Sequence, residues 1–486
     1  MATSTSDTRF AEIDARLAQD PDQVELRYLR AGILAGLGRT DEARQDYLAV
    51  VARAPTHFGA LNDLGTLLYD TDYRTAARTA YAEAVRHHPH NPIGRINLAN
   101  ALLANAQHDE AREHYAAALR LAPDHPDAHQ GMANLLQDLG EEDAAERHRR
   151  QSYEAREITT LPFRGEGRPR RVLVLVSAVG GNIPIRFLLD DRVFEVSTLA
   201  VEARAATAAV LPPHDLVFNA VGDADLGATA LDAVDVVLAR TTAPVINAPC
   251  RVRLTGRAAN AQRLAGLSGV VTPRLAVTPR DQIASAAERF GYPLLLRSPG
   301  FHTGRYFQRV ETPGDLAEAA AGLPGRELML IEFLDARDKQ GQARKYRVMM
   351  IDGRLYPLHL AVSADWKVHY FTADMAERPD LRAEEAAFLN DMPGVLGPVA
   401  MAGLARIAEA LGLDYAGVDF GLNARGEILL FEANATMVVN PPDPDPRWDY
   451  RRAAVERILS AARAMLIARA DGPAATAASS PPGHWP

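Results

Sequence analysis

The sequence predicts a multidomain protein in which an all-α helical solenoid is followed by an α/β domain and then an α+β domain. Three observations predict it: a 34-residue repeat in the first third, short apolar segments alternating with helical stretches after residue 171, and an acidic strand pair near the C-terminus. A chain of 486 residues suits roughly three domains. The expected boundaries are 1–153 for the repeats, 154–170 for a linker, 171–250 for the α/β domain, 251–470 for the α+β domain and 471–486 for a disordered tail.

Composition and charge exclude several classes of protein. With 53 basic and 62 acidic residues the net charge is −9, which argues against nucleic acid as the main partner. No apolar run reaches the roughly 18 residues needed to span a bilayer, and the polar start MATSTSDTRF has no secretory apolar core. The single cysteine, Cys250, excludes an internal disulfide. We therefore expect a cytoplasmic protein with no membrane partner.

The first third of the chain repeats with a period of 34 residues. The positions in register are Ala43, Ala77, Ala111 and Ala145; Tyr47, Tyr81 and Tyr115; Pro55, Pro89 and Pro123; and the small residues Ala31, Gly65, Ala99 and Ala133. Each unit predicts two amphipathic helices that pack at small-residue contacts, with a proline ending the second helix. The period therefore predicts a solenoid of helix pairs.

This pattern resembles tetratricopeptide repeats over residues 21 to about 153. Such repeats usually bind proteins or peptides on the face formed by the first helix of each pair, so the resemblance implies a protein or peptide partner. Asn62, Asn100 and Asn134 lie at positions that could line that face, or they are simply solvated helix residues. A scaffold role or a homodimer formed through the repeats is equally open.

The region after the linker predicts a parallel sheet. Three short apolar strands occur in RVLVLVSAVGGN, HDLVFNAVGDAD and VVLARTTAPVINAP, and helical stretches such as residues 226–238 separate them. Open α/β sheets bind ligands at the carboxyl ends of their strands. Asn219, Asp223 and Asp225 lie at such an end and could contact an ammonium or hydroxyl group of a substrate. Alternatively, they cap the following helix.

The stretch GYPLLLRSPGFHTGRYFQRV, residues 291–310, predicts two strands joined by a glycine loop. The first strand carries Arg297, and the loop contains Gly300 and Gly304. A loop of this kind can offer backbone N–H groups to phosphate oxygens. A further strand is expected over residues 327–335, ending in acidic side chains.

The next segment, KYRVMMIDGRLYPLHL, predicts a β-hairpin that turns at Asp352-Gly353. Lys345 and Arg347 are two residues apart on its first strand, so they share one face of the sheet. Lys367, in SADWKVHYF, is a further cation beyond the second strand.

Two strands near the C-terminus, AGVDFGL and GEILLFEAN, bring acidic and amide side chains together. Glu432 and Asn434 share a face because they are two residues apart. If residues 423–426 form a tight turn, Asp419 lies opposite Leu430 and diagonal to Glu432. Convergent side-chain oxygens suit a hard cation such as Mg²⁺, so these three residues are the predicted metal ligands.

The order of these segments resembles the ATP-grasp superfamily over residues 170 to about 470. The resemblance identifies the α/β part with a pre-ATP-grasp domain and the α+β part with the ATP-grasp domain. Its most specific feature is a D…ExN pattern, matched by Asp419, Glu432 and Asn434. The resemblance implies two cofactors, ATP and Mg²⁺.

Individual roles follow from the resemblance. The ATP-binding set it implies is Arg257, Arg297, Gly300, His302, Thr303, Gly304, Glu332, Phe333, Leu334, Lys345 and Lys367. Asp335 or Asp338 is a candidate for the ribose hydroxyls. Arg257 and Arg297 stand where the family normally has lysines, which keeps the positive charge but replaces a point charge with a planar fork.

The resemblance further implies a ligase that joins a carboxylate to an amine through an acyl phosphate. Arg347 and Arg297 are then the expected catalytic cations, and the substrates are small-molecule or peptide carboxylates and amines. Two other interpretations remain open. One is a nucleotide-binding repeat scaffold without turnover, and the other is a small-molecule kinase of the same fold.

Overall fold

A computed structural model describes residues 5–37, 39–71, 73–154, 158–178, 180–203, 210–300, 306–368, 375–442 and 445–472 of the chain. The chain divides into two compact units, Met1–Ala155 and Arg156–Pro486. Most of the tail predicted from residue 471, that is, residues 473–486, lies outside the described residues.

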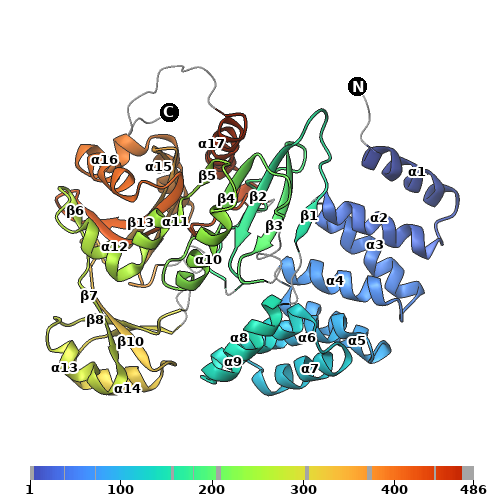
Figure 1. Ribbon diagram of the computed structural model, residues 1–486, viewed down its shortest axis with the longest axis horizontal. Helices are drawn as coiled ribbons and strands as arrows, with labels where there is room; N and C mark the ends of the chain where they lie inside the picture. Colours follow the sequence, from blue (N-terminus) through green and yellow to red (C-terminus); the bar gives the residue numbers. More distant parts are fainter. Residues whose placement is uncertain are drawn as a thin grey trace. The chain divides into compact units, whose positions relative to one another are not determined.

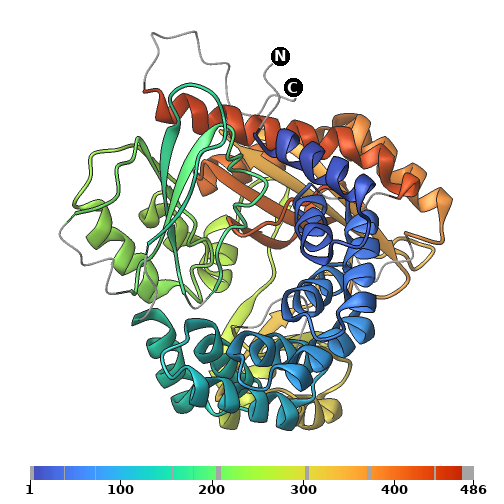
Figure 2. The ribbon, with the colours of Figure 1, turned by 90° about the vertical axis from the view of Figure 1, so that its right-hand side faces the viewer.

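The first unit is a solenoid of consecutive helix pairs, as its repeat predicts (Figures 1 and 2). Its helices are α1 (Thr5–Gln19), α2 (Val24–Gly36), α3 (Thr40–Arg53), α4 (Phe58–Asp70), α5 (Arg74–His87), α6 (Pro92–Ala104), α7 (His108–Leu121), α8 (Pro126–Asp138) and α9 (Glu142–Glu154). The second helix of each pair from α3 onward carries one of the periodic alanines, and each of these alanines is completely buried.

The periodic tyrosines explain why small residues recur in the facing helices. Tyr81, on α5, packs so closely on Gly65 of α4 that an added Cβ would lie 2.6 Å from its ring. Tyr115, on α7, also packs closely on a glycine, but this one, Gly131, lies on α8 in the next pair and outside the periodic positions; an added Cβ there would lie 2.2 Å from the ring. The Tyr115 hydroxyl donates to Asn100 at 2.6 Å. Close ring-to-backbone packing therefore sets the spacing of neighbouring helices.

Replacing Gly131 with alanine is expected to destabilise the first unit by about 1–3 kcal/mol, because the buried Tyr115 ring would have to move to admit the methyl group. Gly32→Ala on α2 is the matched control, since its Cβ would come no closer than 3.8 Å to Tyr47 and alanine favours the helix. Thermal unfolding followed by far-UV circular dichroism measures both. Equal effects of the two substitutions would contradict this packing argument.

The second unit begins with a parallel sheet whose strand order is β1-β3-β2-β4-β5. Its strands are β1 (Thr159–Leu161), β2 (Arg170–Val176), β3 (Phe194–Ala200), β4 (Leu216–Asn219) and β5 (Val245–Ile246), with α10 (Ala228–Leu238) between β4 and β5. All pairings are parallel except that of β1 with β3. The sequence interpretation missed β3, and it placed β1 within a linker, whereas β1 is an antiparallel edge strand.

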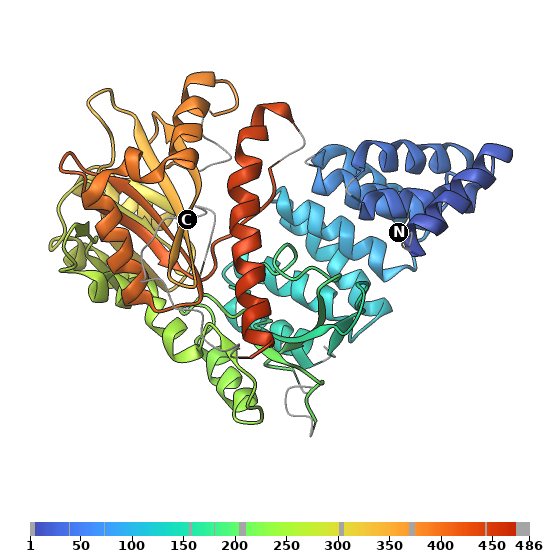
Figure 3. The same cartoon turned by 90° about the horizontal axis from the view of Figure 1, so that it is seen from above.

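A second, central sheet has the order β12-β11-β13-β14-β6. Its strands are β6 (Val270–Val271), β11 (Ala343–Ile351), β12 (Arg354–Ser363), β13 (Tyr415–Leu422) and β14 (Ile428–Asn434). The predicted turn at Asp352-Gly353 is confirmed, since both residues have positive φ, at 48° and 75°. Helices α15 (Pro379–Asn390), α16 (Met392–Leu411) and α17 (Arg452–Ala470) pack on this sheet, and α17, the long helix in Figure 3, also contacts β2 and β4.

The parallel and central sheets share one hydrophobic core, which extends from Val172 and Phe218 to Val418 and Ile458. The predicted boundary at residue 250 therefore separates two sheets within one core. The short helices α11 (Pro249–Val252) and α12 (Arg257–Leu264) connect them.

A third, antiparallel sheet has its own small core and the order β7-β10-β8-β9. Its strands are β7 (Leu275–Pro279), β8 (Leu294–Arg297), β9 (Phe307–Val310) and β10 (Glu327–Glu332), and α13 (Ile283–Ala287) and α14 (Leu316–Ala321) accompany it. The predicted strand pair on either side of the glycine loop is thus present as β8 and β9.

Helix α16 is the one helix within the described residues that is long and apolar enough to cross a membrane by length and composition. A kink at Gly397 interrupts it, with φ 77°. Leu404 and Ile407 on this helix are completely buried in the shared core. Its apolar side chains therefore cover the central sheet.

Candidate functional site

A row of polar residues crosses the central sheet, with one residue on each of four strands. His359 lies opposite Arg347, Arg347 opposite Asp419, and Asp419 opposite Glu432. We call these four residues the charged row. Directly opposed residues on neighbouring strands have Cβ atoms about 4.5–5.5 Å apart, so the two carboxylates are close neighbours.

A β-bulge creates this row. The expected register paired Asp419 with Leu430, and that expectation is wrong: Leu430 lies opposite Phe420, and the register then shifts so that Asp419 lies opposite Glu432. Phe431 is the residue skipped by the pairing. Continued without a bulge from the pairing of Phe420 with Leu430, the register would set Asp419 opposite Phe431, on the other face from Glu432. The bulge therefore keeps both carboxylates on the same face.

Asp419 is held by two cations. Arg347 donates to both of its oxygens, at 2.5 and 2.8 Å, and Lys345 approaches to 3.2 Å. This confirms that the two cations share a face. Burial alone would raise the pKa of the Asp419 carboxyl, but the charges of Arg347 and Lys345 outweigh it and hold that pKa well below its usual value.

Glu432 is held by Arg257, the first residue of α12, with Nη2 to Oε1 at 2.6 Å. Asn434 donates from Nδ2 to the same Oε1 at 2.9 Å, and its Oδ1 accepts from both the backbone and the hydroxyl of Thr436 at 3.0 Å. Burial by itself would raise the pKa of the Glu432 carboxyl. The positive charges of Arg257 and the other cations outweigh this effect and bring the pKa below its usual value, so the carboxylate stays ionised.

Asp419 and Glu432 bring two carboxylates together on one face, and a hard divalent cation prefers such ligands. Asn434 lies beside them with its Nδ2 toward Glu432 and its Oδ1 toward Thr436, so its oxygen would serve a cation only after the amide turned over. Within the described residues, no group of three His, Cys, Asp or Glu side chains could hold a metal ion, and this site contributes two such side chains. Both carboxylates are paired with arginine, so a bound metal would have to replace these ion pairs.

Two of the predicted substrate residues have structural roles. The Asn219 side chain is completely buried, donates to the Asn247 carbonyl at 2.9 Å and accepts from the Val221 N–H, so it is corrected to a residue that supports the strand end. Asp223 accepts from the N–H groups of Asp225 and of Leu226, both at 2.9 Å, and thus stabilises the turn before α10. The N-cap of α10 is Gly227, so the alternative interpretation of Asp223 as a helix cap is wrong.

The third, Asp225, belongs to the charged site. Its Oδ2 accepts from the backbone N–H of Arg257 at 2.9 Å, and burial raises its pKa. An added Cβ on Gly222 would lie 2.9 Å from Thr436, which follows β14. The carboxyl end of β4 therefore packs directly on the carboxyl end of β14, beside Glu432.

Arg297, at the end of β8, is 7% exposed. Besides burial, the nearby charge of Arg257 lowers its pKa, and that of Glu432 raises it. Burial, with the repulsion of Arg257, lowers the pKa of Arg297 to about 10. A buried guanidinium keeps its charge at neutral pH at this pKa, so the site contains four cations: Arg257, Arg297, Lys345 and Arg347.

The predicted ATP-binding residue Phe333 belongs to an aromatic cluster. Trp366 packs edge-on against Phe307, with ring centroids 5.4 Å apart, and against Phe333 at 6.3 Å. Arg309 lies over the Phe333 ring at 4.4 Å, and Lys367 lies over Phe307 at 6.0 Å. The sequence interpretation named Lys367 and missed Trp366, although a lone tryptophan at the end of a strand is a visible signal.

Other predicted residues are less informative. Glu332 forms an exposed ion pair with Arg274 at 3.1 Å, and Leu334 is half-buried. Gly300 has a φ of 81°, which favours glycine, while His302, Thr303 and Gly304 lie outside the described residues. Both ribose candidates form ion pairs: Arg337 contacts both oxygens of Asp335, and Arg344 contacts Asp338.

His359 ends the charged row on β12 and is 5% exposed. Burial, with the positive charge of Arg347, lowers its pKa well below the usual value. The folded protein therefore keeps this imidazole neutral, whereas the unfolded chain takes up a proton below about pH 6.5. The free energy of unfolding should consequently fall as the pH drops through about 6.5.

Between about pH 7.5 and about pH 5.5, the free energy of unfolding is expected to fall by about 1 kcal/mol less in His359→Gln than in the wild type. Urea unfolding followed by tryptophan fluorescence measures it, because all three tryptophans lie in the second unit. Identical pH dependence in the wild type and in His359→Gln would contradict the prediction.

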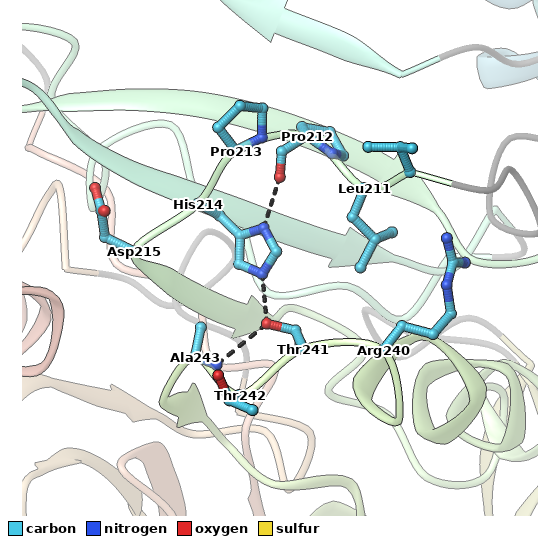
Figure 4. Close-up of a pocket in the computed structure, with 10 residues that line it drawn as sticks. Leu211, Pro212, Pro213, His214, Asp215, Arg240, Thr241, Thr242 and Ala243 are labelled. Atoms are coloured by element: carbon cyan, nitrogen blue, oxygen red, sulfur yellow. Dashed lines mark hydrogen bonds between the residues drawn. The ribbon is translucent and has the colours of Figure 1, made fainter.

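A pocket of about 540 Å³ lies at the opposite, amino ends of β4 and β5 (Figure 4). His214 bridges the two loops there: one ring nitrogen lies 2.6 Å from the Pro212 carbonyl and the other 2.7 Å from the Thr241 hydroxyl. Ala243 donates its N–H to the same hydroxyl at 3.1 Å. These contacts satisfy the polar groups of the loops and link no residue of the charged site.

The asparagines predicted on the first helices of the repeats contact their neighbours. Asn62 accepts from Asn97 at 2.8 Å, which links successive repeats, and the exposed Asn134 accepts from Gln130 at 3.1 Å. The exposed Asn100 accepts from Tyr115. These side chains therefore form part of a polar surface on helices α4, α6 and α8.

Comparisons with known proteins concern the first unit. A tetratricopeptide repeat model matches residues 11–58 and 62–129. Similar solved structures include MamA from Desulfovibrio magneticus RS-1 (19% identity, 31% of this chain and 85% of that chain, TM-score 0.29) and pilF of Pseudomonas aeruginosa (20%, 31% and 69%, TM-score 0.30). A third is YrrB, a TPR protein with an unusual peptide-binding site (18%, 30% and 76%, TM-score 0.28). No curated protein matches the chain. The first unit of this chain is a tetratricopeptide-repeat solenoid, and a mixed α/β region follows it.

Proposed function

We propose that the second unit is an ATP- and magnesium-dependent ligase that joins a carboxylate to an amine, and that the repeats recruit a protein or peptide partner. The observation that carries this proposal is the direct opposition of Asp419 and Glu432, with Arg257, Arg347 and Lys345 in contact with them. A nucleotide triphosphate needs cationic side chains for its phosphates, and its metal ion needs carboxylates close to them. Few other ligands require both kinds of charge in one place.

In this proposal the cations of the site hold the triphosphate. Arg257 and Lys345 can reach it because each is only partly buried, with side chains 21% and 14% exposed. Arg297 supplies a buried charge from the neighbouring sheet. Arg347 faces the transferring phosphate and offsets the negative charge that develops there. Because such a donor is already in position, it lowers the activation barrier of phosphate transfer without any rearrangement of the site.

The reaction has two steps. A carboxylate oxygen of the first substrate attacks the γ-phosphorus of ATP, and ADP leaves with the electron pair of the broken P–O bond. The amine then attacks the acyl carbon, inorganic phosphate leaves, and the amine loses a proton. Mg²⁺ held by Asp419, Glu432 and Asn434 would neutralise phosphate oxygens when bound.

The test is turnover by the full chain with ATP, Mg²⁺ and pooled amino acids and peptides. ADP release that requires both a carboxylate and an amine supports the ligase. Release with one substrate, together with a stable phosphorylated product, supports a kinase instead. The absence of ADP release over a broad substrate set would overturn the enzymatic proposal.

A nucleotide-binding scaffold is the second candidate, favoured by one observation. Both carboxylates are already paired with arginines, so the site is electrostatically satisfied without a ligand. In that case the repeats carry the function and the nucleotide acts as a signal. Binding of ATP without turnover distinguishes this candidate from the ligase.

The aromatic cluster supplies a direct measure of nucleotide binding. If the purine enters beside Phe333, it contacts Trp366, so addition of ATP with Mg²⁺ is expected to change the Trp366 fluorescence. Trp366→Phe should abolish most of the change, whereas Trp448→Phe should keep it. A signal that survives in Trp366→Phe would place the purine elsewhere.

A further inference from the structure

The contacts of the two carboxylates differ in a way that bears on how a metal could bind. Arg347 holds Asp419 with a two-pronged contact from a central strand, and Lys345 adds a third contact. Arg257 reaches Glu432 with a single nitrogen, from the start of a short helix. The Arg257 contact is therefore the weaker of the two and the easier to exchange.

The charge balance of the site opposes a metal ion bound alone. Two carboxylates face three directly contacting cations, Arg257, Lys345 and Arg347, so this contact set already carries an excess of one positive charge. Adding a divalent cation would raise the excess, in surroundings where Asp419 is only 5% exposed and screening is weak. A triphosphate changes the balance, because it offers arginine alternative anionic partners.

We infer that Arg257 is an exchangeable gate on Glu432: without nucleotide it occupies the carboxylate and excludes the divalent cation, and a nucleotide triphosphate draws its guanidinium away and opens Glu432 to the metal. Metal and nucleotide then bind with positive coupling, and each tightens the other. The backbone of Arg257 stays in place during the exchange, because Asp225 holds its N–H at 2.9 Å. This inference rests on the proposed nucleotide site and adds the order in which its ligands bind.

Mn²⁺ is a suitable probe, because its free form is counted by electron paramagnetic resonance without any turnover. The wild-type full chain is expected to bind Mn²⁺ alone at least about tenfold more weakly than in the presence of a non-hydrolysable ATP analogue. Arg257→Met should bind Mn²⁺ alone about tenfold more tightly than the wild type, since Glu432 is then open. Arg257→Lys, which keeps the charge, should remain close to the wild type.

Arg253→Met is the matched control, because this arginine lies four residues upstream and pairs with Asp232 and Asp235 on α10. It should leave Mn²⁺ binding unchanged, and tryptophan fluorescence checks that each variant is folded. Equal Mn²⁺ affinity of the wild type and Arg257→Met, both without nucleotide, would overturn the gate. Failure of the wild type to bind Mn²⁺ even with the analogue would instead overturn the proposed function, so the two failures are distinguishable.

Discussion

Glu432→Gln is expected to lower magnesium-dependent ADP release by about 10²–10³-fold. Glutamine keeps the shape of the side chain and an oxygen that can accept from Asn434, so the change removes little but the negative charge. That charge is what a divalent cation and the triphosphate geometry require in the proposed mechanism. Initial rates of ADP release at saturating ATP measure the effect.

Glu427→Gln is the matched control, because Glu427 lies in the turn that precedes β14, at the far end from Glu432, and contacts Asn423 and Arg425. It should retain the wild-type rate. If both variants release ADP at the wild-type rate while the wild type is active, the carboxylate at 432 is no part of the reaction, and the metal assignment is wrong.

Arg347→Met is expected to destabilise the second unit by about 3–5 kcal/mol at neutral pH, because it leaves the buried Asp419 with only Lys345 as a charged partner. The arginine normally keeps the pKa of Asp419 low. In the variant that pKa rises, so the folded state gains protons relative to the wild type and the difference in stability shrinks as the pH falls below about 4. Urea unfolding followed by tryptophan fluorescence measures this difference.

Arg344→Met provides the comparison on the same strand. Arg344 points to the other face and pairs with Asp338 and Glu384, whose side chains are 30% and 32% exposed, so its loss should cost at most about 1 kcal/mol. The double variant Arg347→Met/Asp419→Leu should recover much of the lost stability, since it removes the unpaired charge as well. Equal losses in Arg344→Met and Arg347→Met would contradict the buried ion pair.

The solenoid could be predicted because its packing is local. Tyr81 packs on Gly65 within one helix pair, so the same residues recur at the same spacing and show the period directly. The hairpin at Asp352-Gly353 was predictable for the same reason, since two adjacent residues determine its turn. Strand β3 has no such marker and was missed.

The register of β13 and β14 could not be predicted, because a bulge depends on how both strands pack on their neighbours. On the expected register Asp419 lay opposite Leu430. The connection between the strands is one residue longer than expected, since Leu422 lies opposite Ile428, and the bulge at Phe431 adds one more residue, so Asp419 lies opposite Glu432. Likewise, the place of Asn219 at the carboxyl end of a strand suggested a ligand contact, whereas the completed fold buries its amide against Asn247.

The sequence alone determined the features that depend on neighbours a few residues apart. These are the repeat, the hairpin turn and the placement of Glu432 and Asn434 on one face of a strand. Only the tertiary structure decided which charges meet. Arg257 and Glu432 are 175 residues apart and touch because two sheets share one core. Contacts across such distances arise from the packing of whole elements, and no local pattern records them.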